Sequence, residues 1–118
     1  IYCTGYSITF PFFNKEFINP KDNEVPLYHK VVHPEHENLF FLGLIQPLGA
    51  IMPLSEVQAK WIASILTGKS TLPSKEKMIK TIAENRNEMR KRYKDSTRHT
   101  VQVDFYPYKR LIEQAMKQ

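Results

Sequence analysis

The chain has 118 residues, of which 42% are apolar and 25% are charged, and its formal net charge is +5. These fractions lie near globular averages and argue against a disordered chain, while the single cysteine, Cys3, argues against a disulfide-dense scaffold. No apolar run approaches the roughly 20 residues that span a bilayer, so we expect the chain itself to be soluble.

The N-terminal part predicts a strand, a turn and a loop. It has no initiator Met and no basic start before a long apolar segment, so it resembles mid-protein sequence rather than a signal peptide. Apolar residues 1–3 predict a short strand that stops at Thr4-Gly5, where the glycine lets the backbone approach another group closely. The aromatic segment 7–13 is interrupted by Pro11, so we expect a buried loop there.

The next part predicts two strands. Residues 19–26 are rich in Pro, Asn and Asp and predict an exposed connection. Residues 27–32 alternate in a way that predicts a half-buried strand, and a polar turn is expected at 33–38. Residues 39–45, LFFLGLI, form a continuous apolar run, typical of a parallel strand that is covered on both faces.

A helix is predicted after this strand. Ser55 can cap it, Gln58 completes a capping box three residues later, and Gly68 ends it. Strand, loop and helix together form the second half of a βαβ-type unit, in which a ligand is expected at the carboxyl end of the strand. The predicted apolar stripe of the helix consists of Val57, Trp61, Ile62, Ile65 and Leu66.

Two more helices are predicted, one from Ser74 to about Tyr93 and a short one from Tyr108. The longer helix has a narrow apolar stripe, so it is expected to pack on a larger body through one edge. Its positive charge does not predict a nucleic-acid partner, because no aromatic or glycine-rich motif accompanies it. The basic residues expected on its outer face are Lys75, Lys77, Lys80, Arg86, Arg90, Lys91, Arg92 and Lys94.

No side chain is a strong candidate for metal binding or covalent catalysis. His29, His33 and His36 invite a zinc hypothesis, but Pro34 prevents one helical face from presenting them and no cysteine is nearby. They are better explained as turn and strand-edge residues. Cys3 lies in an apolar run, where a thiol is usually a small hydrophobic group.

The loop from Gln46 to Gly49 is different, because polar and glycine residues interrupt an apolar run just before a helix. Backbone amides in such a loop, together with the helix N-terminus, favour an electron-rich or anionic ligand group. A simple turn is the alternative. The residues alone therefore suggest a nucleotide-type site and no particular reaction.

Several segments, in this order, resemble the C-terminal portion of the flavin-containing monooxygenases. The resemblance covers nearly the whole chain. The matching segments are C-T-G-Y and F-P-F between Cys3 and Phe12, H-P-E-H at 33–36, G-L-I-Q-P-L-G-A-I-M-P-L-S-E-V-Q-A-K-W at 43–61, L-P-S at 72–74, K-R-Y at 91–93 and R-H-T-V-Q-V-D at 98–104.

The resemblance implies a class B flavoprotein monooxygenase. NADPH reduces FAD, O2 forms a C4a-hydroperoxyflavin, and one oxygen atom passes to a nucleophilic nitrogen or sulfur of small amines or sulfides. It also implies an α/β fold, the C-terminal part of a Rossmann-like flavoprotein with two dinucleotide-binding domains, ending in helices. Residues 1–27 would then end the NADPH-domain region and link back to the FAD domain, and residues 28–118 would belong to the FAD domain. The parent protein would be cytoplasmic or associated with the endoplasmic reticulum.

The resemblance also implies cofactor contacts. Thr4-Gly5-Tyr6 matches the family's A-T-G-Y motif, with Cys3 in place of alanine, where the NADPH domain rejoins the FAD domain. The loop that begins at Gln46 matches a flavin-facing segment, with backbone contacts from its last two residues and a Gln46 contact to the isoalloxazine or the substrate cavity. Ser55 would point toward the pyrimidine edge of the flavin. The expected cofactor-binding residues are Thr4, Gly5, Tyr6, Gln46, Pro47, Leu48, Gly49 and Ser55.

Both family G-x-G-x-x-G loops, for FAD and for NADPH, would lie upstream of Ile1. We therefore expect the isolated chain neither to bind FAD stoichiometrically nor to oxidise NADPH. Two alternatives remain at this point. One is a non-catalytic module whose basic helix, Ser74 to Lys94, binds an acidic partner. The other is a Baeyer–Villiger or N-hydroxylating relative.

Overall fold

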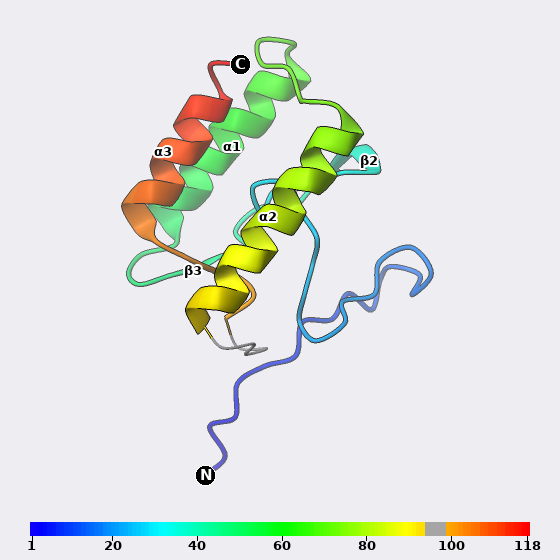
Figure 1. Cartoon of the computed structure of the whole chain (residues 1–118), viewed down its shortest axis with the longest axis vertical. Helices are drawn as coiled ribbons and strands as arrows, with labels where there is room; N and C mark the ends of the chain where they lie inside the picture. Colours follow the sequence, from blue (N-terminus) through cyan, green and yellow to red (C-terminus); the bar gives the residue numbers. More distant parts are fainter. Residues whose placement is uncertain (94–98) are drawn as a thin grey trace.

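The structure, a computed structural model, describes residues 1–93 and 99–118. It is a small α/β fold in which helices α1 and α3 lie side by side, and α2 runs in a similar direction to one side of them in this view (Figure 1). None of the helices in the described ranges is long and apolar enough to cross a membrane. The elements are β1 (Val32–His33), β2 (His36–Phe40), β3 (Gln46–Pro47), α1 (Met52–Leu66), α2 (Lys75–Tyr93), β4 (Gln102–Val103) and α3 (Phe105–Ala115).

The main core lies between α1, α3, α2 and the β1 hairpin. Trp61 of α1 is only 1% exposed and packs near Tyr28, with 6.1 Å between the two ring centroids. A smaller cluster contains Phe10 and Phe13 of the aromatic loop at residues 7–13. The prediction that this loop is buried is wrong, because its residues are exposed or only partly buried, with Phe12 76% exposed. The largest fully buried side chains of the main core are Trp61, Leu54, Met78, Ile112, Gln58, Val31 and Val32.

The predicted end of α1 is confirmed, and its predicted start is wrong. Gly68 has φ 71°, its N–H donates to Ile65 O, and the next N–H donates to Ser64 O, which together form a Schellman motif. At the other end the cap residue is Ile51, with no side-chain cap, because Pro53 in the first turn starts the helix earlier. Ser55 therefore lies inside the helix, where it cannot cap it.

Three predicted strands are wrong. Residues 1–3 form no strand and are exposed. Of residues 27–32 only Val32 lies in a strand, β1, and residues 28–31 form a tight turn, because His29 and Lys30 have φ of 49° and 63° and reverse the chain. In 39–45 the strand β2 ends at Phe40 and pairs antiparallel with β1, so the turn predicted at 33–38 shrinks to residues 34–35.

The sheets are therefore smaller than the apolar run predicts. Gly43, with φ 75°, turns the chain out of the extended conformation, and Leu42 beside it is 57% exposed. Within the described residues, the one parallel pairing joins β3 to β4, with Gln46 beside Gln102 and Pro47 beside Val103. This pairing brings the loop after residue 45 next to the start of α3.

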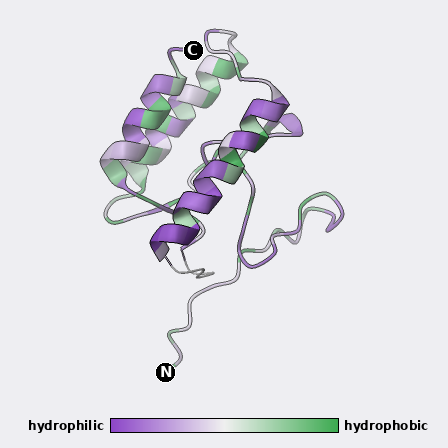
Figure 2. Ribbon diagram, viewed as in Figure 1, coloured by the Kyte–Doolittle hydropathy of each residue, from purple (hydrophilic) through white to green (hydrophobic). Residues whose placement is uncertain are grey.

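The helices that follow agree better with the sequence. α2 begins one residue after the predicted Ser74 and ends at the predicted Tyr93; Lys94 and the start of the motif at 98–104 lie outside the described residues. Met78 is its one buried residue, so α2 does pack by a narrow edge, and Figure 2 shows it largely hydrophilic. α3 begins at Phe105, earlier than the predicted Tyr108, because Pro107 falls in the first turn, where a missing N–H has no cost.

Candidate functional site

The predicted ligand loop, residues 46–49, begins with the two residues of strand β3. The Gln46 N–H donates to Val101 O, with 2.8 Å between nitrogen and oxygen, and Pro47 is buried. Both residues pair with β4, which leads directly into α3. The loop is therefore anchored at its start by backbone pairing with the segment before α3.

Beyond this anchor the chain is open to solvent. Leu48 is 86% exposed, Ile51 40% and Met52 79%, and we call these three side chains the loop surface. Gly49 has φ 121°, which side-chain-bearing residues rarely adopt, and no atom lies within 4 Å of where a Cβ would stand. Such a surface can lie against a planar apolar group, and the backbone at Gly49 can be approached closely.

A chain of hydrogen bonds runs from the segment before this loop into the core. The Gly43 N–H donates to Gln58 Oε1 at 2.8 Å, and Gln58 Nε2 donates to Tyr108 Oη at 2.7 Å. The Tyr108 hydroxyl in turn donates to the His29 carbonyl at 2.7 Å. Burial raises the pKa of Tyr108, and its hydrogen bond with Gln58 opposes that rise only in part, so the phenol stays a neutral donor.

The three histidines fall in two different places. His29 packs near Trp61, with 5.8 Å between ring centroids, and burial lowers its pKa to about 4. The rings of His33 and His36 lie 4.8 Å apart beside Phe17. No three His, Cys, Asp or Glu side chains in the described part of the chain are grouped to hold a metal ion.

The N-terminal motif stands apart from the loop. Thr4, Gly5 and Tyr6 lie on an exposed arm that leaves the helices (Figure 1). One contact between this arm and the rest of the chain is a hydrogen bond from Asn23 Nδ2 to Tyr6 O at 3.2 Å. The structure thus brings the four loop residues together near the start of α1, and it leaves this motif elsewhere.

Ser55 lies close to the loop although it does not cap the helix. Its Oγ would stand 3.3 Å from a Cβ on Gly43, so the first turns of α1 pack tightly against the chain that precedes the loop. A side chain at position 43 would press on Ser55. The glycine therefore allows a close approach between the loop's entry and α1.

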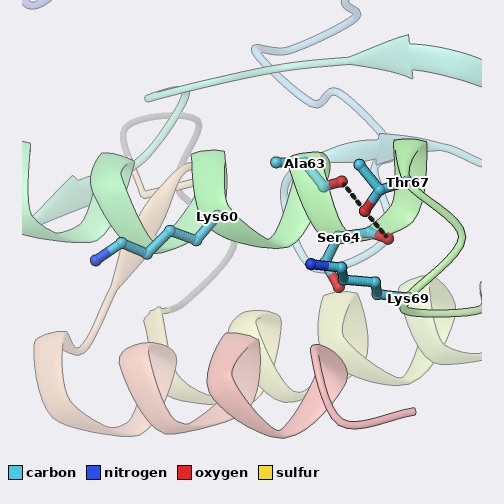
Figure 3. Close-up of a pocket in the computed structure, with 5 residues that line it drawn as sticks. All are labelled: Lys60, Ala63, Ser64, Thr67 and Lys69. Carbon is cyan, nitrogen blue, oxygen red and sulfur yellow. Dashed lines mark hydrogen bonds between the residues drawn. The ribbon is translucent and has the colours of Figure 1, made fainter.

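A shallow hollow of about 250 Å³ lies on α1, with none of the predicted site residues in its lining (Figure 3). The Thr67 hydroxyl within it donates to Ala63 O at 2.8 Å and to Ser64 O at 3.3 Å. This hydroxyl group is therefore already hydrogen-bonded to carbonyl groups of α1. The hollow offers lysine side chains on an open surface and no buried polar group. It has no features of a built binding site.

Comparison with known proteins decides the family. The sequence profile described as "Flavin-binding monooxygenase-like" matches residues 1–117. The chain belongs to this family. Flavin-containing monooxygenase 5 of Rattus norvegicus is 48% identical over 107 residues, which are 89% of this chain and 20% of that protein. Flavin-containing monooxygenase 3 of Homo sapiens is 36% identical over 110 residues, 92% of this chain and 20% of the relative.

A solved structure of the same kind agrees. The S-allyl-L-cysteine S-oxygenase from Allium sativum matches with a TM-score of 0.79 and 32% identity over 97% of this chain and 27% of that one. The chain spans about a fifth (20%) of the length of the curated flavin-containing monooxygenases that it matches. The resemblance drawn from the sequence motifs is therefore confirmed at the level of the family.

Two residues that support the loop of this flavin-binding monooxygenase-like chain were not predicted from the sequence. Gln58 is fully buried in the core, although the sequence pattern assigned it to a cap, and Tyr108 is its buried partner 50 residues away. One signal was present: Gln58 falls between Leu54 and Trp61 at helical spacing, on the buried face. A polar side chain on that face needs a partner, but the sequence does not say which one.

Proposed function

We propose that this chain is the C-terminal part of an NADPH- and FAD-dependent monooxygenase that transfers one oxygen atom from O2 to small nucleophilic substrates. The observation that carries the proposal is the family match over residues 1–117, together with the structural likeness to an S-oxygenase. Nucleophilic nitrogen and sulfur, as in amines and sulfides, are the proposed acceptors. Residues 1–27 are assigned to the end of the NADPH-domain region, and residues 28–118 to the FAD domain of a Rossmann-like enzyme.

The loop surface is the proposed wall against the flavin. Its apolar side chains and the open backbone at Gly49 fit a planar ring system, which supports backbone contacts from Leu48 and Gly49. The exposed Gln46 is assigned to the isoalloxazine or the substrate cavity, and Ser55 to the pyrimidine edge. Pro47 is buried beneath them and is assigned to shaping the loop.

Thr4, Gly5 and Tyr6 are proposed to lie where the two nucleotide-binding domains join. They are exposed in this chain, which is consistent with contacts to a cofactor or to other parts of a longer protein. Gly5, with φ 85° and no atom within 4 Å of a Cβ position, leaves its backbone open to such a contact.

The chemistry belongs to the cofactor and not to these side chains. Bound flavin, reduced by NADPH, supplies the activation of O2 and the oxygen transfer. The residues of this chain bind and orient that group, and the apolar loop surface keeps water away from it. No acid, base or nucleophile of the chain is assigned a catalytic role.

The structure weakens the basic-module alternative. Four of the eight cations predicted on the outer face of α2 contact acidic side chains of other segments: Lys75 lies 2.8 Å from Glu35, Arg86 2.6 Å and Arg90 3.8 Å from Glu24, and Arg92 2.6 Å from Asp104. An acidic partner would have to compete with these contacts. The Baeyer–Villiger alternative is separated by substrate, because such an enzyme converts ketones to esters.

The proposal is tested in a longer polypeptide that carries this chain and the upstream segments found in its relatives. We expect bound FAD, and we expect Gln46→Ala and Gly49→Val to release FAD faster or to divert more NADPH into hydrogen peroxide. FAD retention and hydrogen peroxide yield that match the unaltered protein in both variants would remove these contacts. Absence of flavin from the purified unaltered protein would remove the function.

A further inference from the structure

One buried polar chain joins four segments that are far apart in the sequence. It runs from the Gly43 N–H through the Gln58 amide and the Tyr108 hydroxyl to the His29 carbonyl, with distances of 2.8, 2.7 and 2.7 Å. Gln58 is 0% exposed and Tyr108 6% exposed. Because Gln58 and Tyr108 are buried, water has little access to their polar side-chain groups, and these groups depend on their protein partners.

The chain of hydrogen bonds ends at Gly43, in the segment that leads into the loop. Gly43 lies three positions before Gln46, and its N–H is fixed by a side chain of α1. The Gln46 N–H is fixed by the Val101 carbonyl, just before β4. The segment that leads into the loop is thus held at two points, one on the α1 side and one on the β4 side.

Both points of attachment depend on α3. β4 ends at Val103 and α3 begins at Phe105. The Val101 carbonyl that accepts the Gln46 N–H is therefore positioned by the start of this helix. The Gln58 side chain that accepts the Gly43 N–H is itself held by Tyr108, in the first turns of the same helix. Because α3 supports both attachments, its position can determine the orientation of the loop that follows them.

We infer that Gln58 and Tyr108 are positioning residues, which hold the Gln46–Gly49 loop in the orientation required for its contact with the flavin. This rests on the proposed function. Neither side chain is required to touch the cofactor, since both are buried in the core. Their effect passes through Gly43 and the segment that follows it.

The first test uses the chain itself and no cofactor. Tyr108→Phe removes the hydroxyl and keeps the ring, and Tyr106→Phe is the matched control, because Tyr106 is 73% exposed on the same helix. We expect Tyr108→Phe to increase amide hydrogen exchange at least tenfold at Gly43 and Gln46, whose N–H groups are hydrogen-bonded in the unaltered chain. Exchange in α2 should not change, and the control should behave as the unaltered chain.

A second variant guards against a trivial loss of folding. Gln58→Met keeps the length of the side chain and removes both hydrogen bonds, and the exposed Gln114 gives the control Gln114→Met. Hydrogen exchange of the variants is measured well below their melting midpoints. Loop exchange that stays at the unaltered rate in Tyr108→Phe and Gln58→Met overturns the inference, and so does faster exchange spread evenly over all helices.

The second test uses the longer, flavin-loaded polypeptide. Tyr108→Phe should raise the rate of FAD release about tenfold and shift the flavin absorption or fluorescence spectrum, while Tyr106→Phe leaves both unchanged. A release rate and spectrum equal to the unaltered protein overturn the positioning role while the proposed function stands. If the longer polypeptide holds no flavin, the proposed function fails, and the exchange experiment still decides whether these residues order the loop.

Discussion

The pair α1–α3 and the helix α2 are held in the molecule by different kinds of contact. α1 and α3 bury Leu54, Trp61 and Ile112 completely or almost completely and share the Gln58–Tyr108 hydrogen bond. α2 fully buries one residue, Met78, packs the partly buried Ile82 against the core, and makes its other described contacts through ion pairs on the surface. Salt weakens exposed ion pairs but does not weaken the burial of apolar side chains. The α1–α3 pair, which supports the proposed flavin wall, should therefore be less sensitive to salt than α2.

The largest expected effect is in the α1–α3 pair. Trp61→Ala should lower the free energy of unfolding by about 3–5 kcal/mol, because it leaves a large cavity in a close-packed core. Leu66→Ala on the same helix is the control, because Leu66 is 65% exposed, and it should cost less than about 1 kcal/mol. Denaturant titration measures both. Equal costs would show that α1 does not anchor the core.

The attachment of α2 should depend mainly on its one fully buried side chain, Met78. Met78→Ala should cost about 2–4 kcal/mol, because Met78 is 0% exposed. Ile79→Ala, at a neighbouring position that is 45% exposed, should cost well under half as much. The comparison between the two helices breaks down if Ile79→Ala is the more costly substitution in denaturant titration.

The core turn at His29 should make stability depend on pH. Burial lowers the pKa of His29 from 6.5 to about 4, so between these values the unfolded chain binds a proton that the folded chain does not. Stability is therefore retained above pH 6.5 and falls as the pH drops toward 4, by at most about 3 kcal/mol from this group.

Two variants isolate that contribution. His29→Asn removes the titrating ring and tolerates the φ of 49° at this position, so its unfolding free energy should fall less between pH 6.5 and 4. The exposed His36 provides the comparison His36→Asn, which should remove less of the pH dependence than His29→Asn does. The same pH slope in both variants would contradict a buried, neutral His29.

The smallest effect is expected at the ion pairs of α2. Glu24→Gln removes the contact of 2.6 Å with Arg86 and should cost less than about 1 kcal/mol at low salt, because both side chains are partly exposed. The cost should shrink further in about 1 M salt. The exposed Glu37 gives the control Glu37→Gln. A loss that is unchanged by salt would show that α2 is held by something other than exposed charges.

The helices were predictable from the sequence because their signals are local. The apolar spacing and Gly68 determined the body and end of α1, and the pattern after Ser74 gave α2 to within one residue. The strands were not predictable in this way. The run at 39–45 is apolar enough for a parallel strand, but Gly43 turns it, and nothing in the side chains of His29 and Lys30 announces a positive φ.

The candidate site was predictable only in part. Its loop follows from the motif around Gln46, and the family from several motifs in order. The support behind the loop could not be predicted, because Gln58 finds its partner Tyr108 only after two further helices have packed. Contacts between parts of the chain that are distant in sequence are set by tertiary packing, and local patterns do not encode them.

The most direct test of the central claim follows the oxygen atom. The longer polypeptide that carries this chain is purified and supplied with NADPH, isotopically labelled O2 and a small sulfide or tertiary amine. We predict bound FAD and a sulfoxide or N-oxide that contains one labelled oxygen atom by mass spectrometry. A protein without flavin, or a product without label, would contradict the account, and labelled ester from a ketone in place of these products would assign the Baeyer–Villiger reaction instead.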